Sequence, residues 1–137
     1  MLPQITLTTF DYERLHALLD SPAARGVAVA DVLAEELDRA ELLEPSELPA
    51  DVVSMNSRLR FVFDPEPEVY EYTLSWPRDA GLDDGPRLSV FTPIGAALLG
   101  LRVGDTIDWT VPSGKSVRLR VTELLWQPES NGEDLGR

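Results

Sequence analysis

Cysteine is absent from this chain of 137 residues, which excludes a disulfide framework, a thiolate nucleophile and any cysteine-based zinc or iron–sulfur site. Lysine and histidine each occur once, against eleven arginines. The longest uncharged run covers 14 residues, 88–101, and is shorter than the ~20 residues that a membrane helix needs. Residues 1–6 show no basic segment followed by an apolar one, so we expect no signal peptide. These absences favour a cytoplasmic protein.

Positive charge is also scarce, because 24 acidic residues against 12 basic ones give a formal net charge of -12. Binding duplex nucleic acid or an anionic membrane surface requires clustered Lys and Arg, so the composition argues against both. The charge favours a protein partner with a basic patch. Residues 1–53 alone carry a net charge of -8. We expect a monomer without a cofactor or a resident metal ion.

Residues 8–43 show the periodicity of two amphipathic helices. The first is predicted to begin at Thr8 or Thr9, where a threonine hydroxyl can cap free N–H groups, and to end before Pro22. The second is predicted over residues 28–43. Two such helices joined by a short loop predict an antiparallel hairpin whose apolar stripes bury each other. The stripes consist of Tyr12, Leu15, Leu18 and Leu19, and of Val29, Val32, Leu33, Leu37 and Ala40.

Beyond residue 50 the pattern changes to short alternating runs separated by turn residues, which is typical of β-strands. Residues 44–50 contain two prolines and are interpreted as a connector. The sequence therefore predicts an α+β protein, with a helical hairpin arm and connector at 1–50 and an antiparallel β-sheet domain with one short helix at 51–137. Strands are expected at 52–55, 59–63, 69–76, 106–111 and 117–126, a loop at 79–86, a turn at 112–115, and a frayed tail from Gln127.

The short helix is predicted directly after Thr92 and Pro93. Threonine is a favourable N-cap, and proline suits the first helical position because its missing N–H has no partner there. Gly100 is a natural left-handed stop after about two turns. Phe91 and Ile94, which flank the start of this helix, are interpreted equally well as core residues or as part of an exposed docking edge. Trp76, Trp109 and Trp126 are expected to be core or strand-edge aromatics, since no basic groove accompanies them.

Three features resemble reactive sites but have simpler explanations. His16 and Asp20 could form a dyad, although such a pair is usually a solvated feature near a helix C-terminus. The run 114–116, Gly-Lys-Ser, resembles the end of a P-loop, but Trp109 stands where that motif needs glycine, and a hairpin turn explains the run better. The acids of the arm could include a magnesium-binding pair, but a solvated helix face explains them better. These acids are Asp20, Asp31, Glu35, Glu36 and Asp38.

Residues 88–105, LSVFTPIGAALLGLRVGD, resemble the C-terminal domain of the bacterial Gre transcript-cleavage factors. There a Ser-Pro-hydrophobic-Gly segment leads into Ala-Leu-Leu-Gly and Val-Gly-Asp. With residues 33–40 (LAEELDRA) and 51–58 (DVVSMNSR), the nearly full-length likeness is to the Rnk family of this superfamily, the regulators of nucleoside diphosphate kinase. The resemblance implies an FKBP-like C-terminal domain and an N-terminal antiparallel coiled coil.

The resemblance also implies binding to RNA polymerase at the rim of its secondary channel. From the acidic composition we expect no direct, specific nucleic-acid binding. The segment that contacts the polymerase in Gre factors corresponds to Phe91, Thr92 and Pro93, and we extend the expected contact to Ile94. Phe91 departs from the acid or amide of the Gre pattern, which suggests a more apolar contact. The expected arm tip includes Asp20, Ser21 and Arg25.

Gre factors cleave backtracked RNA with acidic residues at the tip of a long arm. Here the predicted helices would give an arm of only ~17–24 Å, and Asp20 is the single acid of the tip loop. We therefore expect a non-enzymatic regulator that competes with Gre-type factors without cleaving transcripts. The alternatives are regulation of nucleoside diphosphate kinase, as the family name implies, a peptidyl-prolyl isomerase suggested only by the expected fold, and residual cleavage through Asp20.

Overall fold

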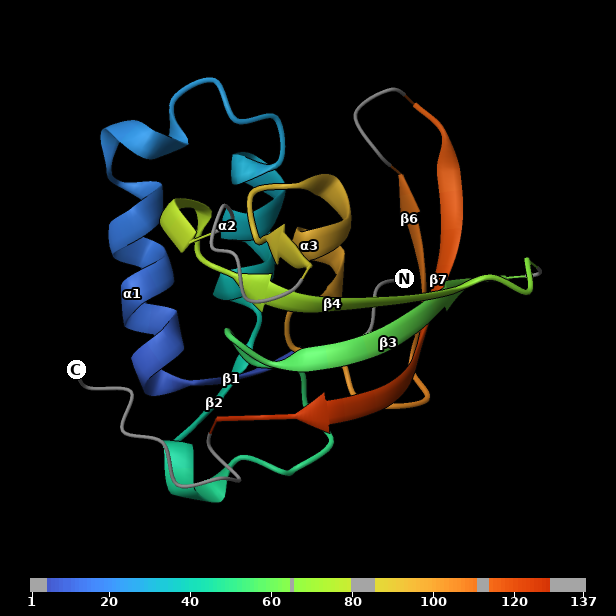
Figure 1. The fold of residues 1–137 in the computed structure, drawn as a ribbon. Helices are drawn as coiled ribbons and strands as arrows, with labels where there is room; N and C mark the ends of the chain where they lie inside the picture. Colours follow the sequence, from blue (N-terminus) through green and yellow to red (C-terminus); the bar gives the residue numbers. More distant parts are fainter. Residues whose placement is uncertain (1–4, 65, 80–85, 111–113, 129–137) are drawn as a thin grey trace.

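The computed structural model describes residues 5–64, 66–79, 86–110 and 114–128. The N-terminal part forms a short helical arm, in which α1 and α2 lie side by side (Figure 1). The hydroxyl oxygen of Thr8 accepts a hydrogen bond from the Asp11 N–H at 3.0 Å, which confirms the predicted start of the first helix. The elements of this part are β1 (Thr6–Thr8), α1 (Thr9–Leu19), the 3-10 turn η1 (Pro22–Ala24), α2 (Ala30–Asp38), β2 (Glu41–Leu43) and the 3-10 turn η2 (Pro45–Glu47).

The second helix is shorter than the predicted span of 28–43, because it begins at Ala30 and ends at Asp38. Residues 41–43 instead form β2, which pairs in parallel with β1, and the Glu41 N–H donates to the Ile5 carbonyl at 2.9 Å. Pairing with a strand 35 residues away satisfies these backbone groups, and local periodicity cannot reveal such a partner. The expected burial of Val32 is also wrong, since this side chain is 36% exposed.

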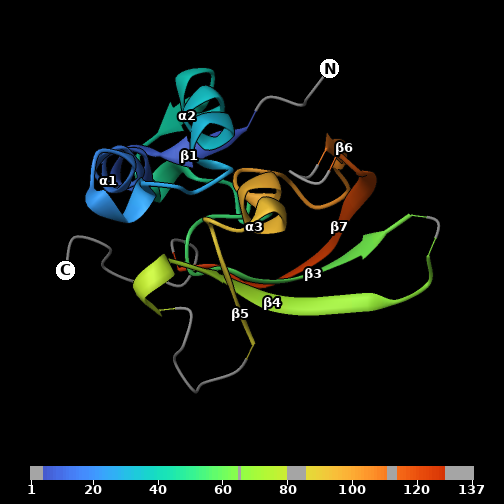
Figure 2. The ribbon, with the colours of Figure 1, turned by 90° about the horizontal axis from the view of Figure 1, so that it is seen from above.

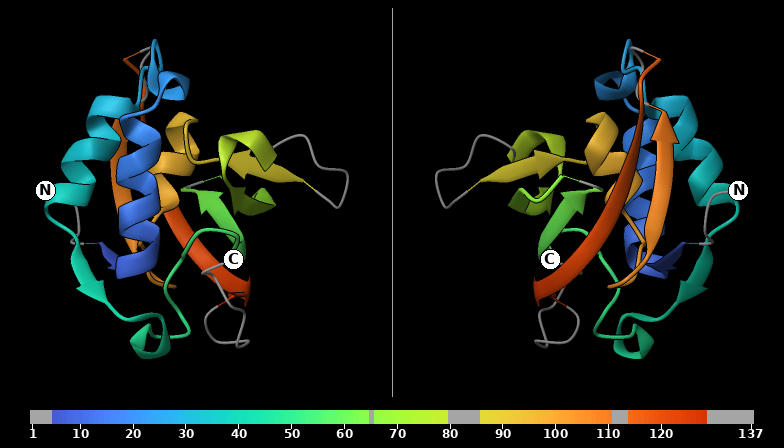
Figure 3. Two further views of the ribbon diagram at one scale, coloured as in Figure 1. Left: turned by 90° about the vertical axis from the view of Figure 1, so that its left-hand side faces the viewer. Right: turned by 90° about the vertical axis from the view of Figure 1, so that its right-hand side faces the viewer.

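The C-terminal part is a curled five-stranded sheet in the order β5-β4-β3-β7-β6. The prediction of an antiparallel sheet is only partly right, because β4 and β5 run parallel. Eleven residues, 76–86, separate the two strands, too many for the two-residue turn that joins antiparallel neighbours. Figure 3 shows the curl, with β7 bending along its length beside β6. The strands are β3 (Arg58–Phe63), β4 (Val69–Ser75), β5 (Arg87–Ser89), β6 (Thr106–Thr110) and β7 (Ser116–Trp126), with the 3-10 turn η3 (Pro77–Asp79).

The short helix α3 (Pro93–Leu98) lies over the sheet on the same side as α1 and α2, so the other face of β3 and β4 carries no helix in the described chain (Figure 2). One continuous apolar core joins the arm to the sheet and includes Leu15, Leu33, Phe61, Leu98 and Val121. None of the helices in the described ranges is long and apolar enough to cross a membrane.

Two further predictions need correction. Residues 52–55 form no strand but run beside residues 100–102, where the Val53 N–H donates to the Leu101 carbonyl at 2.8 Å. Gln127 is only 1% exposed, and its side-chain amide donates to the carbonyls of Pro49 and Val52, so the chain is still anchored where fraying was expected. Some of the predicted segments lie outside the described residues. These are 129–137 of the tail, 112–113 of the expected turn and 80–85 of the expected loop.

Candidate functional site

The segment between β5 and α3 is held by its own hydrogen bonds. The Thr92 hydroxyl donates to the Ser89 carbonyl at 2.6 Å and accepts from the Gly95 N–H at 3.1 Å, so the predicted N-cap is confirmed. The Phe91 N–H donates to the Ser89 hydroxyl at 3.1 Å. A Cβ atom at Gly95 would lie 2.0 Å from the Ser89 carbonyl oxygen, so this tight turn requires glycine. The segment is therefore preorganised before any partner binds.

Phe91, Thr92, Pro93 and Ile94 are all half-buried. Phe91 and Ile94 pack against the apolar core, as the core interpretation predicts, and each keeps part of its surface accessible. Docking at this edge stays a prediction. Ile94 also borders a small apolar hollow of about 160 Å³. Aromatic side chains line most of the hollow, whose residues are Phe61, Phe63, Tyr70, Tyr72, Leu88 and Ile94.

The arm tip lies between α1 and α2. Asp20 and Arg25 are exposed, while Ser21 is half-buried and its hydroxyl donates to the Leu18 carbonyl at 2.6 Å. The helices of 11 and 9 residues give an arm only about 14–16 Å long, which is shorter than expected. Asp20 is the one acid in the loop 20–26, so the tip holds no pair of carboxylates.

The prediction that the arm acids line a solvated helix face is confirmed for most of them. It is wrong for Glu36, which is only 4% exposed. Burial raises the pKa of the Glu36 carboxyl, and Arg39, at 2.5 Å, opposes that shift. Asp20, Asp31, Glu35 and Asp38 are exposed. Within the described ranges no three His, Asp or Glu side chains gather as a metal site would require.

His16 contacts the edge of the Tyr12 ring, at 4.5 Å between ring centroids. No hydrogen bond joins its ring to the Asp20 carboxylate in the part of the chain that the structure describes, so the geometry offers no dyad there. Trp76 and Trp109 are buried as expected, whereas Trp126 at the end of β7 is 38% exposed.

Comparison with known proteins divides the chain into two matched regions. Residues 48–125 match the family described as "Transcription elongation factor, GreA/GreB, C-term", and residues 3–43 match "Rnk N-terminus". The Regulator of nucleoside diphosphate kinase of Escherichia coli (strain K12) is 47% identical over 133 residues, which are 97% of each chain. The chain belongs to the Rnk family.

The chain is also similar to the Gre factors, whose C-terminal domain is the family that matches residues 48–125. A solved structure described as a prokaryotic transcription elongation factor GreA/GreB from Nitrosomonas europaea is 39% identical, with a TM-score of 0.71, over 90% of this chain and 99% of that one. Transcription elongation factor GreA of Prosthecochloris aestuarii is 35% identical over 85 residues, only 52% of its own length. The chain is thus a transcription-related member of the Gre superfamily with a distinct N-terminal region.

Sequence reasoning also missed one group of side chains, on the sheet face without helices. The alternation of Arg58 and Arg60 with buried Leu59 and Phe61 is the signal that could have indicated it.

Proposed function

We propose that this chain is a non-enzymatic, cytoplasmic regulator that binds RNA polymerase near the secondary channel and competes there with Gre-type factors, without cleaving transcripts. The observation that carries the proposal is the combination of a Gre-type C-terminal domain with an arm of only about 14–16 Å. The domain supplies the docking segment Phe91–Ile94. The arm is too short for the transcript cleavage that Gre factors perform with a longer arm.

The short arm matters because cleavage depends on placing carboxylates and their metal ion at the reacting phosphate within about an ångström. A tip with one acid, Asp20, offers no second carboxylate to share an ion. Binding without cleavage is the outcome that this geometry favours.

The docking segment has the properties of a small protein-binding anchor. Its backbone is held by the Ser89–Thr92 and Thr92–Gly95 hydrogen bonds, so little conformational entropy is lost on binding. Phe91 and Ile94 present partly accessible apolar surface beside the aromatic hollow. Residues 1–53, which include the arm and connector, carry a net charge of -8 and would steer the chain toward a basic channel mouth.

The decisive experiment measures association with purified core RNA polymerase and its loss when excess GreA is added. Phe91→Ser with Ile94→Ser should abolish association, whereas Val69→Ser, at an exposed apolar residue of β4 outside the segment and the arm, is the control and should change it little. Absence of association at micromolar concentrations contradicts the proposal. Shortened transcripts from backtracked complexes with magnesium would show that the arm-length argument is wrong.

The name of the Escherichia coli relative favours a second candidate, an effect on nucleoside diphosphate kinase. Adding the purified chain to the purified kinase separates two kinds of effect. A direct effect changes the rate of the kinase, whereas an indirect effect through transcription leaves that rate unchanged. The geometry of the described residues supports the polymerase proposal more strongly because it offers a preorganised docking segment.

A further inference from the structure

A hollow of about 380 Å³, which we call the arm hollow, lies between the arm and the end of β4. Its volume is within the size range of small-molecule sites. One wall comes from α1 and the turn η1, and the other comes from η3 and the residue before it. Both matched regions, 3–43 and 48–125, therefore contribute to the arm hollow, and ligand sites often form where two parts of a chain meet.

Arg14 of α1 places a positive charge in the arm hollow. Its guanidinium carbon lies 4.5 Å from the centre of the Trp76 ring and 5.5 Å from that of the Phe10 ring. A guanidinium over an aromatic ring is attracted by the electrons of the ring, and its five N–H donors remain for an acceptor. The two rings therefore fix where the charge lies without neutralising it.

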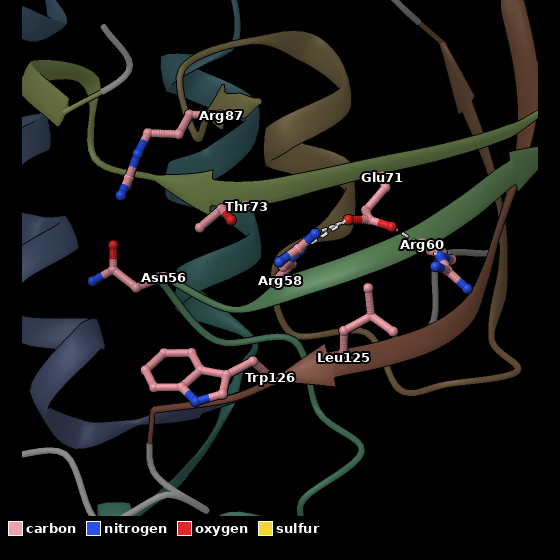
Figure 4. Close-up of a pocket in the computed structure, with 8 residues that line it drawn as sticks. All are labelled: Asn56, Arg58, Arg60, Glu71, Thr73, Arg87, Leu125 and Trp126. Atoms are coloured by element: carbon pink, nitrogen blue, oxygen red, sulfur yellow. Dashed lines mark hydrogen bonds and ion pairs between the residues drawn. The ribbon is translucent and has the colours of Figure 1, made fainter. Parts of the chain in front are cut away.

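No carboxylate pairs with Arg14 within the described ranges, although the chain has 24 acidic residues. The larger hollow on the sheet face without helices, about 770 Å³, differs in this respect. There Glu71 accepts hydrogen bonds from both Arg58 and Arg60 (Figure 4). Arg78 also lines the arm hollow, but it has an interaction of its own. Arg14 is thus the charged group on which a ligand site here depends.

The lining determines the chemistry of the ligand. A guanidinium binds a carboxylate through two parallel hydrogen bonds. No carboxylate is among the described residues that line the arm hollow, so none of them repels an anion at close range. A carboxylate on an apolar body complements both the charge and the rest of the wall. That wall is mostly apolar and includes Ala17, Leu18, Ala23, Trp76 and Pro77.

A peptide with an acidic side chain offers the same carboxylate but suits the wall less well. Each residue of a bound peptide brings a backbone N–H and C=O that need partners when they are buried. Ser21 carries the one hydroxyl among the described lining residues, and it already donates to the Leu18 carbonyl at 2.6 Å. A small acid without amide groups leaves no such groups unpaired.

We propose that the arm hollow binds a small carboxylic acid with an apolar body, with its carboxylate on the Arg14 guanidinium and its body against Leu18 and Pro77. Because the arm and the sheet part form the hollow together, the bound acid stabilises the arm against the sheet part. The arm hollow shares no lining residue with the docking segment Phe91–Ile94. Binding of the acid to the chain alone is therefore independent of polymerase binding.

The test is titration of the full chain with 4-phenylbutyrate, measured by calorimetry and by NMR spectra of the backbone amides. The acid should bind saturably and shift the amides of Ala17 and Ala23. The neutral 4-phenylbutan-1-ol has the same body and should bind at least tenfold more weakly, as should acetate, which lacks the body. Arg14→Gln should weaken binding of the acid at least tenfold. Arg14→Lys keeps the charge but loses the planar fork, so it should recover part of the binding.

Ala17→Leu tests the arm hollow without changing the charge. Ala17 is an exposed helix residue that lines the hollow, so the larger side chain should fill the space and weaken binding about fivefold. The matched control is Arg118→Gln, which removes the same charge from an exposed arginine of β7 outside the hollow. This variant should bind the acid within twofold of the parent, and circular dichroism of each variant checks that the fold is kept.

Four results would each overturn the proposal. The first is a lack of saturable binding at millimolar 4-phenylbutyrate, and the second is equal binding of the alcohol. The third is a loss in Arg118→Gln as large as that in Arg14→Gln. The fourth is tighter binding of a capped leucine–glutamate–leucine peptide than of the small acid, because the hollow would then take a protein segment.

Discussion

The carboxylate of Asp11 in α1 accepts a hydrogen bond from the backbone N–H of Met55, at 3.1 Å, and both residues are almost fully buried. The bond joins the arm to the segment that leads into the sheet. Burying a backbone N–H without a partner costs free energy comparable to that of a lost hydrogen bond. Asp11 therefore fixes where the arm starts relative to the sheet.

We expect Asp11→Ala to lower the free energy of unfolding by about 2 kcal/mol, because it leaves the Met55 N–H buried and unpaired. Asp11→Asn keeps an acceptor oxygen and should recover part of the loss. The measurement is urea unfolding at pH 7. Asp31→Ala, at an exposed acid in the first turn of α2, is the control and should change the free energy by about 0.5 kcal/mol or less.

Gly100 lies where the C-terminal part meets β1. Its φ is +79°, and an added Cβ would lie 2.5 Å from the Ile5 Cβ atom. Gly100→Ala should lower the free energy of unfolding by about 3 kcal/mol, because backbone strain and overpacking add. Gly104 has a φ of +94° with nothing within 4 Å of an added Cβ, so Gly104→Ala should cost only about 1 kcal/mol. Thermal unfolding of both variants measures the difference. If Gly100→Ala and Gly104→Ala lose the same stability, the contact with Ile5 does not contribute.

Thr92 caps α3 and bonds back to Ser89. We expect Thr92→Ala to destabilise the chain by about 1 kcal/mol and to weaken polymerase binding, because the docking segment loses its internal hydrogen bonds. Thr92→Ser keeps the hydroxyl and should behave like the parent in both denaturation and binding. If Thr92→Ser loses as much stability and polymerase binding as Thr92→Ala, the methyl group matters rather than the hydroxyl cap.

Glu36 and Asp64 should give opposite dependences of stability on pH. Burial raises the pKa of Glu36 above its ordinary 4.5, so the folded state holds a proton that the unfolded state releases, and stability falls as pH rises through that window. Glu36→Gln should therefore gain stability relative to the parent above pH 4.5 and differ little below it. Denaturant unfolding between pH 3 and 8 measures the difference.

A hydrogen bond from Arg120 lowers the pKa of Asp64 below its ordinary 3.8. Its contribution to stability is then present above that value and lost as pH falls through the lowered pKa. Asp64→Asn should accordingly be less stable than the parent at neutral pH, with the loss disappearing in acid. The difference in free energy of unfolding between variant and parent should therefore change with pH in opposite directions for Glu36→Gln and Asp64→Asn. A change in the same direction contradicts these assignments.

Local signals predicted the elements whose causes are local. The Thr8 cap, the Thr92–Pro93 start of α3 and the positive φ of Gly100 depend on neighbouring residues, and each was found as expected. Elements that depend on distant partners were missed. The β1–β2 pair joins residues 35 positions apart, and local periodicity therefore extends the predicted helix into the residues of β2.

The sequence by itself determined the α+β class, the family and the capped start of α3, because capping, periodicity and motif residues act over a few positions. Only the tertiary structure decided which faces are covered. It buried Glu36, exposed Trp126, and placed Arg87, Arg58 and Trp126 in one row across four strands. That row depends on strand register between segments up to 68 residues apart, and register is a property of paired strands rather than of any one strand.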